Sequence, residues 1–339
     1  MRILLLAGGD SSERTVSLET GAAIYESLKR LGHIVLAIDA ASGKSLLTND
    51  GKFIDFKNDS SIKSLNTSKS KAWPVANALG SPAFQDMEIV FIALHGGSGE
   101  DGMLQCLLEM AGKQHTGSSM EASAIAMDKA VSKKLCVAEN IDTPDFALYR
   151  IRSGKIDDRL VEEIRNRFEL PIIVKPNNGG STIGLSKVGD EANIKAALEK
   201  SLAESTAVLV EKYIKGREIT AAVLNGKPLS LVEIKPKNEL YDFEAKYVKG
   251  KSEYIVPAPI DENVAREIQK AAVKIYNVIG CAGLARVDFI LDEENKFYFL
   301  ELNSLPGMTE LSLAPMAAKY DGMEFDQLVE EIIKSAWHE

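Results

Sequence analysis

The stretch ARVDFILDEENKFYFLELN, residues 285–303, contains two apolar runs separated by a polar turn around Glu294 and Asn295. Apolar and polar side chains that alternate on both sides of a short polar segment are typical of a β-hairpin. A turn centred on these two residues sets the pairing of the two strands. Each side chain then has a defined cross-strand partner, so the polar residues that meet on one face can be predicted.

Four polar side chains of this hairpin are predicted to share one face. Asp288 lies opposite Glu301, and Arg286 lies opposite Asn303, because side chains two apart on a strand point the same way. The other face is predicted to hold Val287, Phe289, Leu300 and Leu302. Two carboxylates and an amide oxygen are ligands that Mg²⁺ prefers in proteins. A solvated face with ordinary cross-strand ion pairs fits the same pattern, and the hairpin alone leaves both interpretations open.

The N-terminal part has the pattern of a doubly wound parallel sheet. A buried strand over Ile3–Ala7 ends in a glycine turn, a helix follows as far as Leu31, and a second strand covers Ile34–Ile38. Ser17 is the predicted N-cap of this helix, and Gly32 is its C-terminal stop. The order strand, helix, strand indicates an α/β layer with parallel strands.

Three domains are predicted along the chain. A third buried strand at Ile89–Leu94 and the helix after it complete an N-terminal domain over 1–118. Mixed strands and helices predict a central α+β domain over 119–213 and a C-terminal domain over 214–339, which contains the hairpin. The segment 42–73, rich in Ser, Lys and Asn, is interpreted as a surface insertion.

Composition limits the partners of the chain. It has 339 residues, with 40 Lys+Arg against 49 Asp+Glu and a net charge of -9. This charge disfavours nucleic acid or an anionic membrane as a partner over a broad surface. A small anionic substrate remains possible where basic residues converge. A hydrophobic content of 45% excludes disordered and collagen-like chains.

Cysteine usage and the N-terminus indicate the compartment. Cys106, Cys136 and Cys281 are odd in number and form no CxxC pair. Neither a disulfide framework nor a zinc site is therefore predicted. The N-terminal apolar run is too short for a signal peptide or a transmembrane helix, so we expect a protein of the reducing cytoplasm.

The segment Lys175-Pro-Asn-Asn-Gly-Gly-Ser-Thr-Ile-Gly184 is a glycine-rich turn between two predicted strands. Glycines allow backbone N–H groups to approach phosphate oxygens, and the hydroxyls of Ser181 and Thr182 add donors. The Gly-Lys-Ser/Thr of a Walker A loop is absent, so any nucleotide is bound in another way. In isolation the loop also fits a glycine hairpin that binds nothing.

Two further motifs allow more than one interpretation. Gly97–Gly102 matches GxGxxG between a strand and a helix, which is the context of an NAD-dependent dehydrogenase. Glu100 and Asp101 oppose that function, because they place negative charge where a pyrophosphate would bind. His95, just before them, is either a core histidine or a ligand contact. Glu211–Glu218 offers acceptors for an adenine amine and ribose hydroxyls, but its composition is also that of a polar turn.

In this order the segments resemble the D-alanine–D-alanine ligases of the ATP-grasp superfamily, over essentially the whole chain except 42–73. The resemblance rests on GGDSSERTVSLETG from Gly8, LHGGSGEDG from Leu94 and MDKAVSK from Met127. It continues through VKPNNGGSTIG, EKYIKGRE, YDFEAKY, ARVDF and LELNSLPGMTELSL. It implies a three-domain ATP-grasp fold and the ATP-driven joining of two D-alanines through an acyl phosphate.

The resemblance also implies roles for individual residues. ATP would be bound by Lys129, Lys175, Glu211, Lys212, Tyr213, Ile214, Glu218 and Lys246, with Lys129 and Lys175 at the phosphates. Two Mg²⁺ or Mn²⁺ ions would be held by Asp288, Glu301 and Asn303. The first D-alanine would meet Glu13 and His95, with Ser181 and Tyr247 hydrogen-bonded to Glu13. Arg286 and the backbone N–H of Gly307 would stabilise the oxyanion, and Ser312 and Leu313, with Arg286, would bind the second D-alanine.

Several further expectations come from the resemblance. It implies a homodimer, a role in peptidoglycan precursor synthesis, and lids formed by the loops around Ser181 and Tyr247. An intact EAKY ending at Tyr247 favours an amine as second substrate, which disfavours a D-alanine–D-lactate ligase. A D-alanine–D-serine ligase remains an alternative. A catalytically dead nucleotide-binding regulator is expected to have a broken metal triad, whereas all three of those residues are present.

Overall fold

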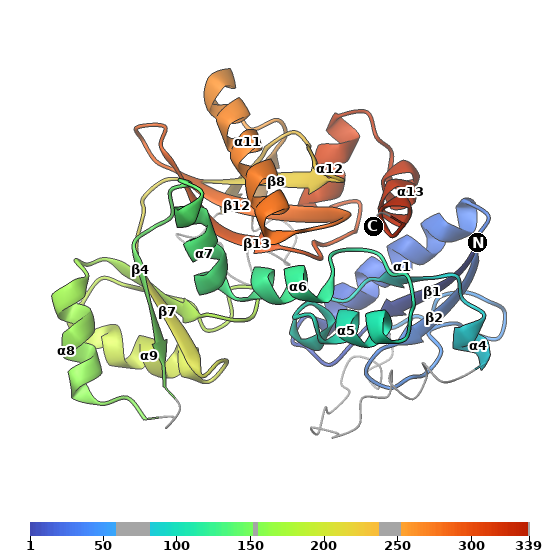
Figure 1. Cartoon of the computed structure of the whole chain (residues 1–339), viewed down its shortest axis with the longest axis horizontal. Coiled ribbons are helices and arrows are strands. Elements are labelled where there is room, and N and C mark those ends of the chain that lie inside the picture. The colour runs from blue at the N-terminus through green and yellow to red at the C-terminus, as the bar shows by residue number, and fades with distance from the viewer. Residues whose placement is uncertain (59–81, 152–154, 237–251, 338–339) are drawn as a thin grey trace.

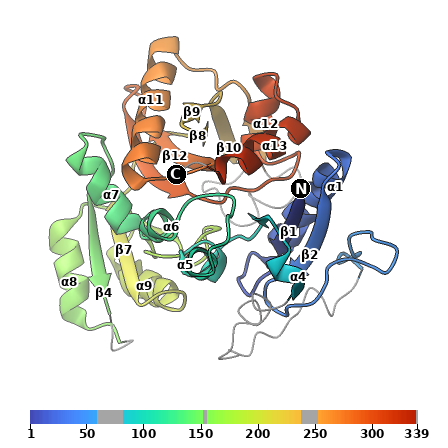
Figure 2. The ribbon, with the colours of Figure 1, turned by 45° about the vertical axis from the view of Figure 1, so that its right-hand side comes forward.

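The computed structural model describes residues 1–58, 82–151, 155–236 and 252–337. Within these residues the strands form three sheets, which Figures 1 and 2 show in separate parts of the molecule. The N-terminal sheet, in blue, and the central sheet, in green to yellow, lie on opposite sides below the C-terminal sheet in orange. Each sheet falls within one of the three predicted domains, whose limits remain predictions.

The N-terminal sheet is parallel and is covered on both faces, as predicted. Its strands are β1 (Arg2–Ala7), β2 (Ile34–Asp39) and β3 (Ile89–Ile92), in the order β2-β1-β3. Helix α1 (Arg14–Arg30) packs on one face, while α4 (Pro82–Gln85) and α5 (Met103–Met110) pack on the other. The short helix η1 (Gly97–Gly99) follows β3. Alternate residues of β1 therefore face two different cores.

Helix α1 begins earlier than predicted. Its first residue is Arg14 and its N-cap is Glu13, whereas Ser17 is fully buried inside the helix and donates to the Ala93 carbonyl at 2.6 Å. A buried ion pair explains the difference, because the Arg14 guanidinium contacts both Asp39 oxygens at 2.7 and 3.0 Å. This pair holds the first turn against the end of β2, and no sequence periodicity reports it.

The segment 42–73 is more than a surface insertion in its first part. Leu46 and Phe56 are buried in the N-terminal core, and Phe53 packs against that core. The Phe53 ring also lies 5.8 Å from the ring of Tyr25 on α1. The interpretation of 42–58 as purely superficial is therefore wrong, because a few apolar residues among polar ones are enough to anchor a segment. Residues 59–73 lie outside the described part of the chain.

The central sheet is antiparallel and carries its helices on one side. Its strands are β4 (Phe146–Arg150), β7 (Ala207–Lys212), β5 (Ile172–Pro176) and β6 (Ser186–Val188), in that spatial order. Helices α8 (Asp158–Arg167) and α9 (Ile194–Leu202), the latter preceded by η2 (Glu191–Asn193), share one apolar core with the sheet. Strand β5 pairs with β7 on one side and with β6 on the other, which holds the strand end at Lys175 and the loop to β6 at one end of this sheet.

The C-terminal sheet is the largest and is covered on both faces. Its strands β11 (Ser252–Ile255), β10 (Val232–Pro236), β8 (Arg217–Leu224), β12 (Leu284–Leu291) and β13 (Phe297–Asn303) lie in that order, and β9 (Lys227–Pro228) pairs with β8. One face packs against α6 (Met120–Met127), α7 (Lys129–Ala138) and α11 (Glu262–Ile279). On the other face, α12 (Leu313–Tyr320) and α13 (Phe325–Ser335) share a core with α1 and β1.

The hairpin β12–β13 has the predicted register only in the half that bears polar residues. Arg286 pairs with Asn303 and Asp288 with Glu301, but a β-bulge then shifts the register, so that Phe289 pairs with Phe299. The extra residue is Leu300. The prediction that Leu300 lies on the apolar face is therefore wrong: Leu300 lines a cavity, and Phe299 takes the core position instead.

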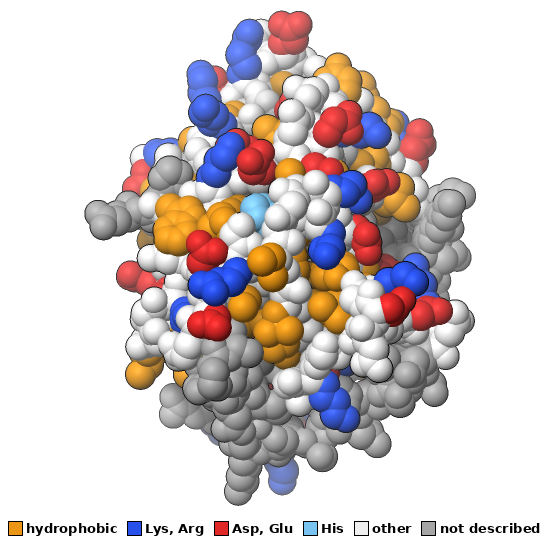
Figure 3. All heavy atoms as spheres, turned by 90° about the vertical axis from the view of Figure 1, so that its right-hand side faces the viewer, with side chains coloured by type: hydrophobic (Ala, Val, Ile, Leu, Met, Phe, Trp, Pro, Cys, Tyr) orange, Lys and Arg blue, Asp and Glu red, His pale blue; other side chains and the backbone are white. Residues whose placement is uncertain are grey.

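On the face shown in Figure 3, lysine and arginine side chains alternate with aspartate and glutamate, and hydrophobic side chains lie between them. Mixed charge of this kind gives little net field over that face. No helix within the described residues has both the length and the apolar content that crossing a membrane requires.

The bulge makes a prediction about stability. Phe299→Ala should lower the free energy of unfolding by about 3–5 kcal/mol, because it opens a cavity in a fully buried core. Leu300→Ala should cost about 1 kcal/mol or less, because that side chain already faces open space. Urea unfolding followed by circular dichroism measures both. A larger loss for Leu300→Ala than for Phe299→Ala would contradict the observed register.

Candidate active site

An open cavity lies between the central and C-terminal sheets, with about 750 Å³ of empty space that includes part of the adjoining solvent. Its lining comes from four separate parts of the chain, namely Lys129, the strand end at Lys175, the loop 179–183, and a polar group on the C-terminal sheet. That polar group comprises Glu218, Asp288 and Glu301. Residues predicted to bind phosphate, ribose and metal thus meet in one place, although more than a hundred positions separate some of them.

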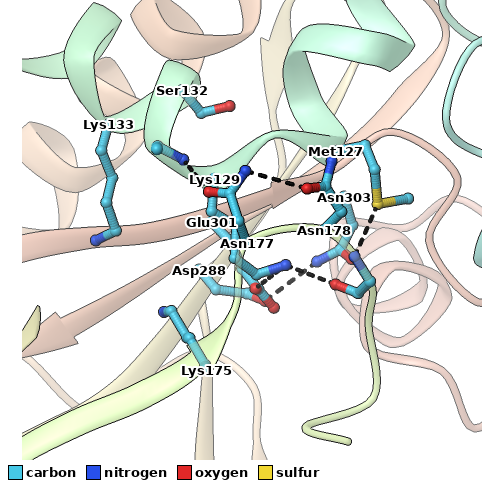
Figure 4. Close-up of polar contacts among 12 residues, drawn as sticks. Met127, Lys129, Ser132, Lys133, Lys175, Asn177, Asn178, Asp288, Glu301 and Asn303 are labelled. Atoms are coloured by element: carbon cyan, nitrogen blue, oxygen red, sulfur yellow. Dashed lines mark hydrogen bonds and ion pairs between the residues drawn. The ribbon is translucent and has the colours of Figure 1, made fainter. Parts of the chain in front are cut away.

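Lys129 is placed by the start of α7 and by the strand end that follows Lys175. The Asn177 carbonyl accepts a hydrogen bond from the Lys129 backbone N–H at 3.2 Å, and the Asn177 side chain accepts one from Ala130 at 2.9 Å (Figure 4). The Lys129 ammonium donates to the Gly179 carbonyl at 2.6 Å and lies 3.3 Å from Glu301 Oε2. The two lysine-bearing elements are therefore tied together at the cavity wall.

Lys175 is held by Glu211, which is buried behind the cavity. The Lys175 ammonium lies 2.7 Å from Glu211 Oε1, and the ammonium of Lys133 lies 3.0 Å from Oε2. Burial alone would raise the pKa of Glu211, but the two lysines hold that pKa below its ordinary value. The Glu211 carboxylate thus stays ionised and shares its charge between two cations.

The polar face of the hairpin is organised around Asp288. The Arg286 guanidinium donates to both Asp288 oxygens at 2.9 and 2.8 Å, and the Thr220 hydroxyl donates at 2.6 Å. The Asn303 amide nitrogen donates at 3.3 Å, the longest of these bonds. Glu301, the cross-strand partner, lines the same cavity. The predicted cluster of two carboxylates, an amide and an arginine is confirmed as a geometric fact.

The donor chemistry of this cluster fits a hard divalent cation. Among the described residues, no three His, Cys, Asp or Glu side chains are arranged so that they could hold a metal ion, so a cation here would have two carboxylates and an amide oxygen. Mg²⁺ commonly takes few protein oxygens and completes its shell with water and phosphate. Asp288 would have to exchange one present bond, and the long bond from Asn303 is the weakest. Rotation of the Asn303 amide would turn its oxygen toward the place that a cation beside Asp288 would occupy.

Glu13 connects the N-terminal layer to the glycine-rich loop. The Ser181 hydroxyl donates to Glu13 Oε1, as the resemblance implied. A side chain at Gly96 would place its Cβ 2.5 Å from Glu13 Oε2, and one at Gly180 would place it at 3.0 Å. A side chain at Gly96 would therefore force the carboxylate to move, and one at Gly180 would crowd it.

The glycine-rich loop holds an unusual backbone at its tip. Ser181 and Thr182 have φ values of 52° and 63°, in the left-handed region that side chains other than glycine rarely occupy. Such conformations persist where surrounding contacts impose them, and they concentrate at functional sites. The bond from Ser181 to Glu13 is one such contact, since it anchors the loop to another layer.

His95 and Glu100 hold the two backbone polar groups of one residue, Leu305. The Leu305 carbonyl lies 2.9 Å from His95 Nδ1, so this nitrogen carries the hydrogen, and Nε2 accepts from the Thr20 hydroxyl at 2.9 Å. Glu100 accepts from the Leu305 N–H at 3.4 Å and from the Gly96 N–H at 3.0 Å. The loop after β13 is thus fixed to the N-terminal layer, and His95 is a positioning contact here.

Burial controls the protonation of both groups. It lowers the pKa of His95 below its ordinary value and raises the pKa of Glu100 to about 7. The negative charge of nearby Glu13 adds to the rise at Glu100. Glu100 thus lies behind the loop as a buried carboxyl, held by backbone N–H groups.

The remaining predicted residues are placed as follows. Ser312 is the N-cap of α12 and accepts from the Thr309 N–H at 3.1 Å, while a Cβ at Gly307 would lie 3.0 Å from its hydroxyl oxygen. The Leu313 side chain is part of the core.

The predicted adenine contacts follow β7. The backbone N–H of Lys212 donates to the Asp145 carbonyl at 2.9 Å, and that of Tyr213 donates to the Pro171 carbonyl at 3.2 Å. The Lys187 ammonium lies 4.0 Å from the centre of the Tyr213 ring. Ile214 follows directly. Lys246 and Tyr247 lie outside the described residues.

Sequence reasoning misses three residues of the site. Lys133 stands in the sequence only as part of a quoted motif, although it lies one helical turn after Lys129, a spacing that puts both on one side of α7. In the sequence, Glu100 is notable only because its negative charge opposes the binding of a pyrophosphate. Thr220 belongs to β8, the neighbour of β12, and only strand pairing brings it to Asp288. For Lys133 a signal exists in the helical spacing, whereas Thr220 leaves none.

Comparison with known proteins gives a consistent family. The family model for the D-ala D-ala ligase N-terminus matches residues 2–118, and that for the C-terminus matches residues 135–334. A D-alanine--D-alanine ligase of Syntrophotalea carbinolica is 42% identical over 335 residues, 99% of this chain and 96% of the relative. One of Francisella tularensis subsp. novicida is 38% identical, over 99% of this chain and 98% of the relative.

Solved structures agree with the fold. The D-alanine--D-alanine ligase of Bacillus anthracis complexed with ATP has a TM-score of 0.76 at 29% identity and covers 99% of this chain and 97% of its own. The VanG D-Ala:D-Ser ligase of Enterococcus faecalis has a TM-score of 0.79 at 29% identity and covers 99% of both chains. The predicted fold class, an N-terminal parallel sheet within an ATP-grasp architecture, is thereby confirmed.

Glu100 makes a prediction about pH. Its folded-state pKa of about 7 lies above the ordinary 4.5, so its contribution to stability is complete below pH 4.5 and is lost as the pH rises through 7. Relative to the wild type, Glu100→Gln should therefore gain about 2–3 kcal/mol in unfolding free energy between pH 5 and pH 8. Urea unfolding at both pH values measures the difference. A difference that does not change with pH would contradict the buried, raised carboxyl.

Proposed function

This chain belongs to the D-alanine–D-alanine ligase family, and on that ground we propose that it joins two D-alanines into D-alanyl-D-alanine while ATP becomes ADP and phosphate. The observation that carries the proposal is the convergence of Lys129, Lys175, Asp288 and Glu301 on one cavity, beside Glu13 and the glycine-rich loop. These residues are the ones that phosphoryl transfer and the binding of a small amino acid require.

The cavity supplies what the phosphates of ATP need. Lys129 and Lys175 are compact cations on two tied elements, and the loop 179–183 adds backbone N–H groups and hydroxyls. Glu218 lines the same cavity and is proposed to accept hydrogen bonds from the ribose. The buried oxygen Oε2 of Glu211 has no hydrogen-bond partner in the described structure besides its ion pair with Lys133, which supports its proposed role toward the adenine amine. Lys212, Tyr213 and Ile214 would provide the adjacent adenine contacts.

Asp288, Glu301 and Asn303 are the proposed ligands of two Mg²⁺ or Mn²⁺ ions. A bound ion would neutralise charge on the transferring phosphoryl group. The residues themselves set where this can happen, because strand pairing places Glu301 opposite Asp288 at the cavity and the Arg286 fork keeps Asp288 oriented. The Lys129 ammonium, 3.3 Å from Glu301, lies on the same side.

Glu13 is proposed to bind the ammonium of the first D-alanine. Its carboxylate is largely buried, anchored by Ser181 and closely approached by two glycines, and such a crowded setting disfavours a large substrate. With the ammonium fixed there, the substrate carboxylate can be directed toward the γ-phosphate to form the acyl phosphate. Tyr247 is the proposed second partner of Glu13.

The second half of the reaction is assigned to the loop after β13. The amine of the second D-alanine attacks the acyl carbon, and phosphate leaves. Arg286 and the Gly307 N–H would stabilise the oxyanion, and Ser312, with Arg286, would bind the carboxylate of the second D-alanine beside the backbone of Leu313. His95 and Glu100 fix Leu305 in this loop, so the N-terminal layer contributes to the position of Gly307.

Further parts of the proposal follow from membership of the family. They are a homodimer, the domain limits 1–118, 119–213 and 214–339, a cytoplasmic location, and supply of the dipeptide for peptidoglycan precursors. D-Serine is the alternative second substrate, because the structure is also similar to the VanG D-Ala:D-Ser ligase. D-Lactate is the less favoured one, since the sequence keeps EAKY up to Tyr247.

Phosphate release from Mg-ATP tests the proposed function. The enzyme is given D-alanine, D-serine, D-lactate and L-alanine, singly and each paired with D-alanine, and products are identified by mass. We expect release with D-alanine alone and D-alanyl-D-alanine as product. Release only with a mixed pair would move the second substrate to the other member. Bound ATP without release under any condition would overturn the ligase assignment.

Glu301→Gln tests the assignment of the metal ligands. It keeps the shape of the side chain but removes its charge, so ligation should fall by roughly 100-fold or more while the protein still folds. Glu294→Gln, in the exposed turn of the same hairpin, is the matched control and should keep full activity. Turnover of the Glu301 variant close to that of the control would refute the assignment.

A further inference from the structure

Lys133 is a buried cation that the proposed mechanism does not use. Its side chain is fully buried on α7 and does not line the cavity. The ammonium donates to the Thr143 hydroxyl at 2.7 Å and to the Phe299 carbonyl at 3.3 Å, and lies 3.0 Å from Glu211 Oε2. A buried charge lowers the stability of the fold unless buried partners compensate for it. The charge of Lys133 is therefore to be understood together with that of Glu211.

We propose that Lys133 is a positioning residue that sets the charge available at Lys175, and through it the affinity of the cavity for phosphate. Glu211 lies between the two lysines, with one carboxylate oxygen 2.7 Å from Lys175 and the other 3.0 Å from Lys133. The proposal rests on the proposed function in one respect, namely that ATP is the ligand of this cavity. It adds a residue that affects ATP without touching it.

The argument is a balance of charges. Two ammonium groups and one carboxylate leave a net charge of one positive unit in this cluster, and only Lys175 presents it to the cavity. Without Lys133, Glu211 would neutralise Lys175 alone, and the cluster would present no net charge. Because Glu211 is only 2% exposed, water screens this balance poorly, and the effect on a phosphate is strong.

The surroundings of Lys133 keep it charged and in place. Burial lowers its pKa to about 8, and the charge of Glu211 opposes a further fall, so the ammonium form predominates at pH 7. The rings of Phe146 and Phe299 lie 5.8 and 5.9 Å from the ammonium and favour a cation. Thr143 also donates to the Phe299 carbonyl at 2.8 Å, which fixes this acceptor.

The first test compares Lys133→Met with Lys134→Met, a neighbouring lysine on the same helix whose side chain is exposed. Binding of Mg-ATP to the full chain is measured by titration calorimetry, and the inhibition constant of adenosine, which lacks phosphates, is measured against ATP. Lys133→Met should raise the Kd of ATP by about tenfold or more, and Lys134→Met by less than about twofold. The inhibition constant of adenosine should not change in either variant. An equal loss for ATP and adenosine would overturn the proposal, because it would indicate a general effect on the fold or the adenine contacts.

A second pair of variants separates the charge effect from instability. Lys133→Met leaves an unpaired carboxylate in the interior and can impair folding. The double variant Lys133→Met/Glu211→Gln removes both charges and again leaves one positive unit at Lys175. The double variant thus has the same net charge in this cluster as the wild type. The ratio of its Kd for ATP to its inhibition constant for adenosine should therefore stay within about threefold of the wild-type ratio, because any loss at the adenine affects both ligands.

A tenfold rise of this ratio in the double variant relative to the wild type would overturn the inference, since the affinity for phosphate would then not follow the net charge of the cluster. Because the readout is the affinity for ATP, the test does not depend on the second half of the proposed function. A wild-type protein that binds ATP but does not ligate D-alanine would refute the ligase assignment and leave the result for Lys133 standing.

Discussion

The register of β12 and β13 is the constraint on which both the core and the cavity depend. One extra residue, Leu300, lets the same hairpin present Asp288 and Glu301 to the cavity at one end and Phe289 and Phe299 to the core at the other. The shift also places the Phe299 carbonyl where Lys133 and Thr143 bind it. A regular hairpin would have to sacrifice either the buried aromatic pair or the polar face.

The candidate site is held together by polar contacts between layers. Glu13 and Ser181 connect the N-terminal layer to the glycine-rich loop, and Asn177 connects that loop to α7. Leu305 is held at both its N–H and its carbonyl by the N-terminal layer. Movement of one layer would therefore disturb more than one substrate contact. This arrangement suits a reaction whose acyl phosphate must be kept from water.

The positions of most helices and strands can be predicted because they depend on local periodicity. The helix at Met103–Met110 and the buried strands of the N-terminal layer are examples. The errors have tertiary causes. The start of α1 depends on the buried pair of Arg14 with Asp39, and the anchoring of 42–58 depends on a core that other segments complete. Leu300 is misplaced because a bulge leaves no pattern in the sequence.

The sequence alone is enough to infer the family, the order of helices and strands, and the residue types that the chemistry requires. Motifs and periodicity are local properties of the chain. Which charges meet is a property of the folded molecule. Thr220 reaches Asp288 through strand pairing, Glu211 lies between Lys175 and Lys133, and Glu100 is buried beside Glu13. Burial and distance set the strength of a charge interaction, and both come from the packing of segments far apart in the chain.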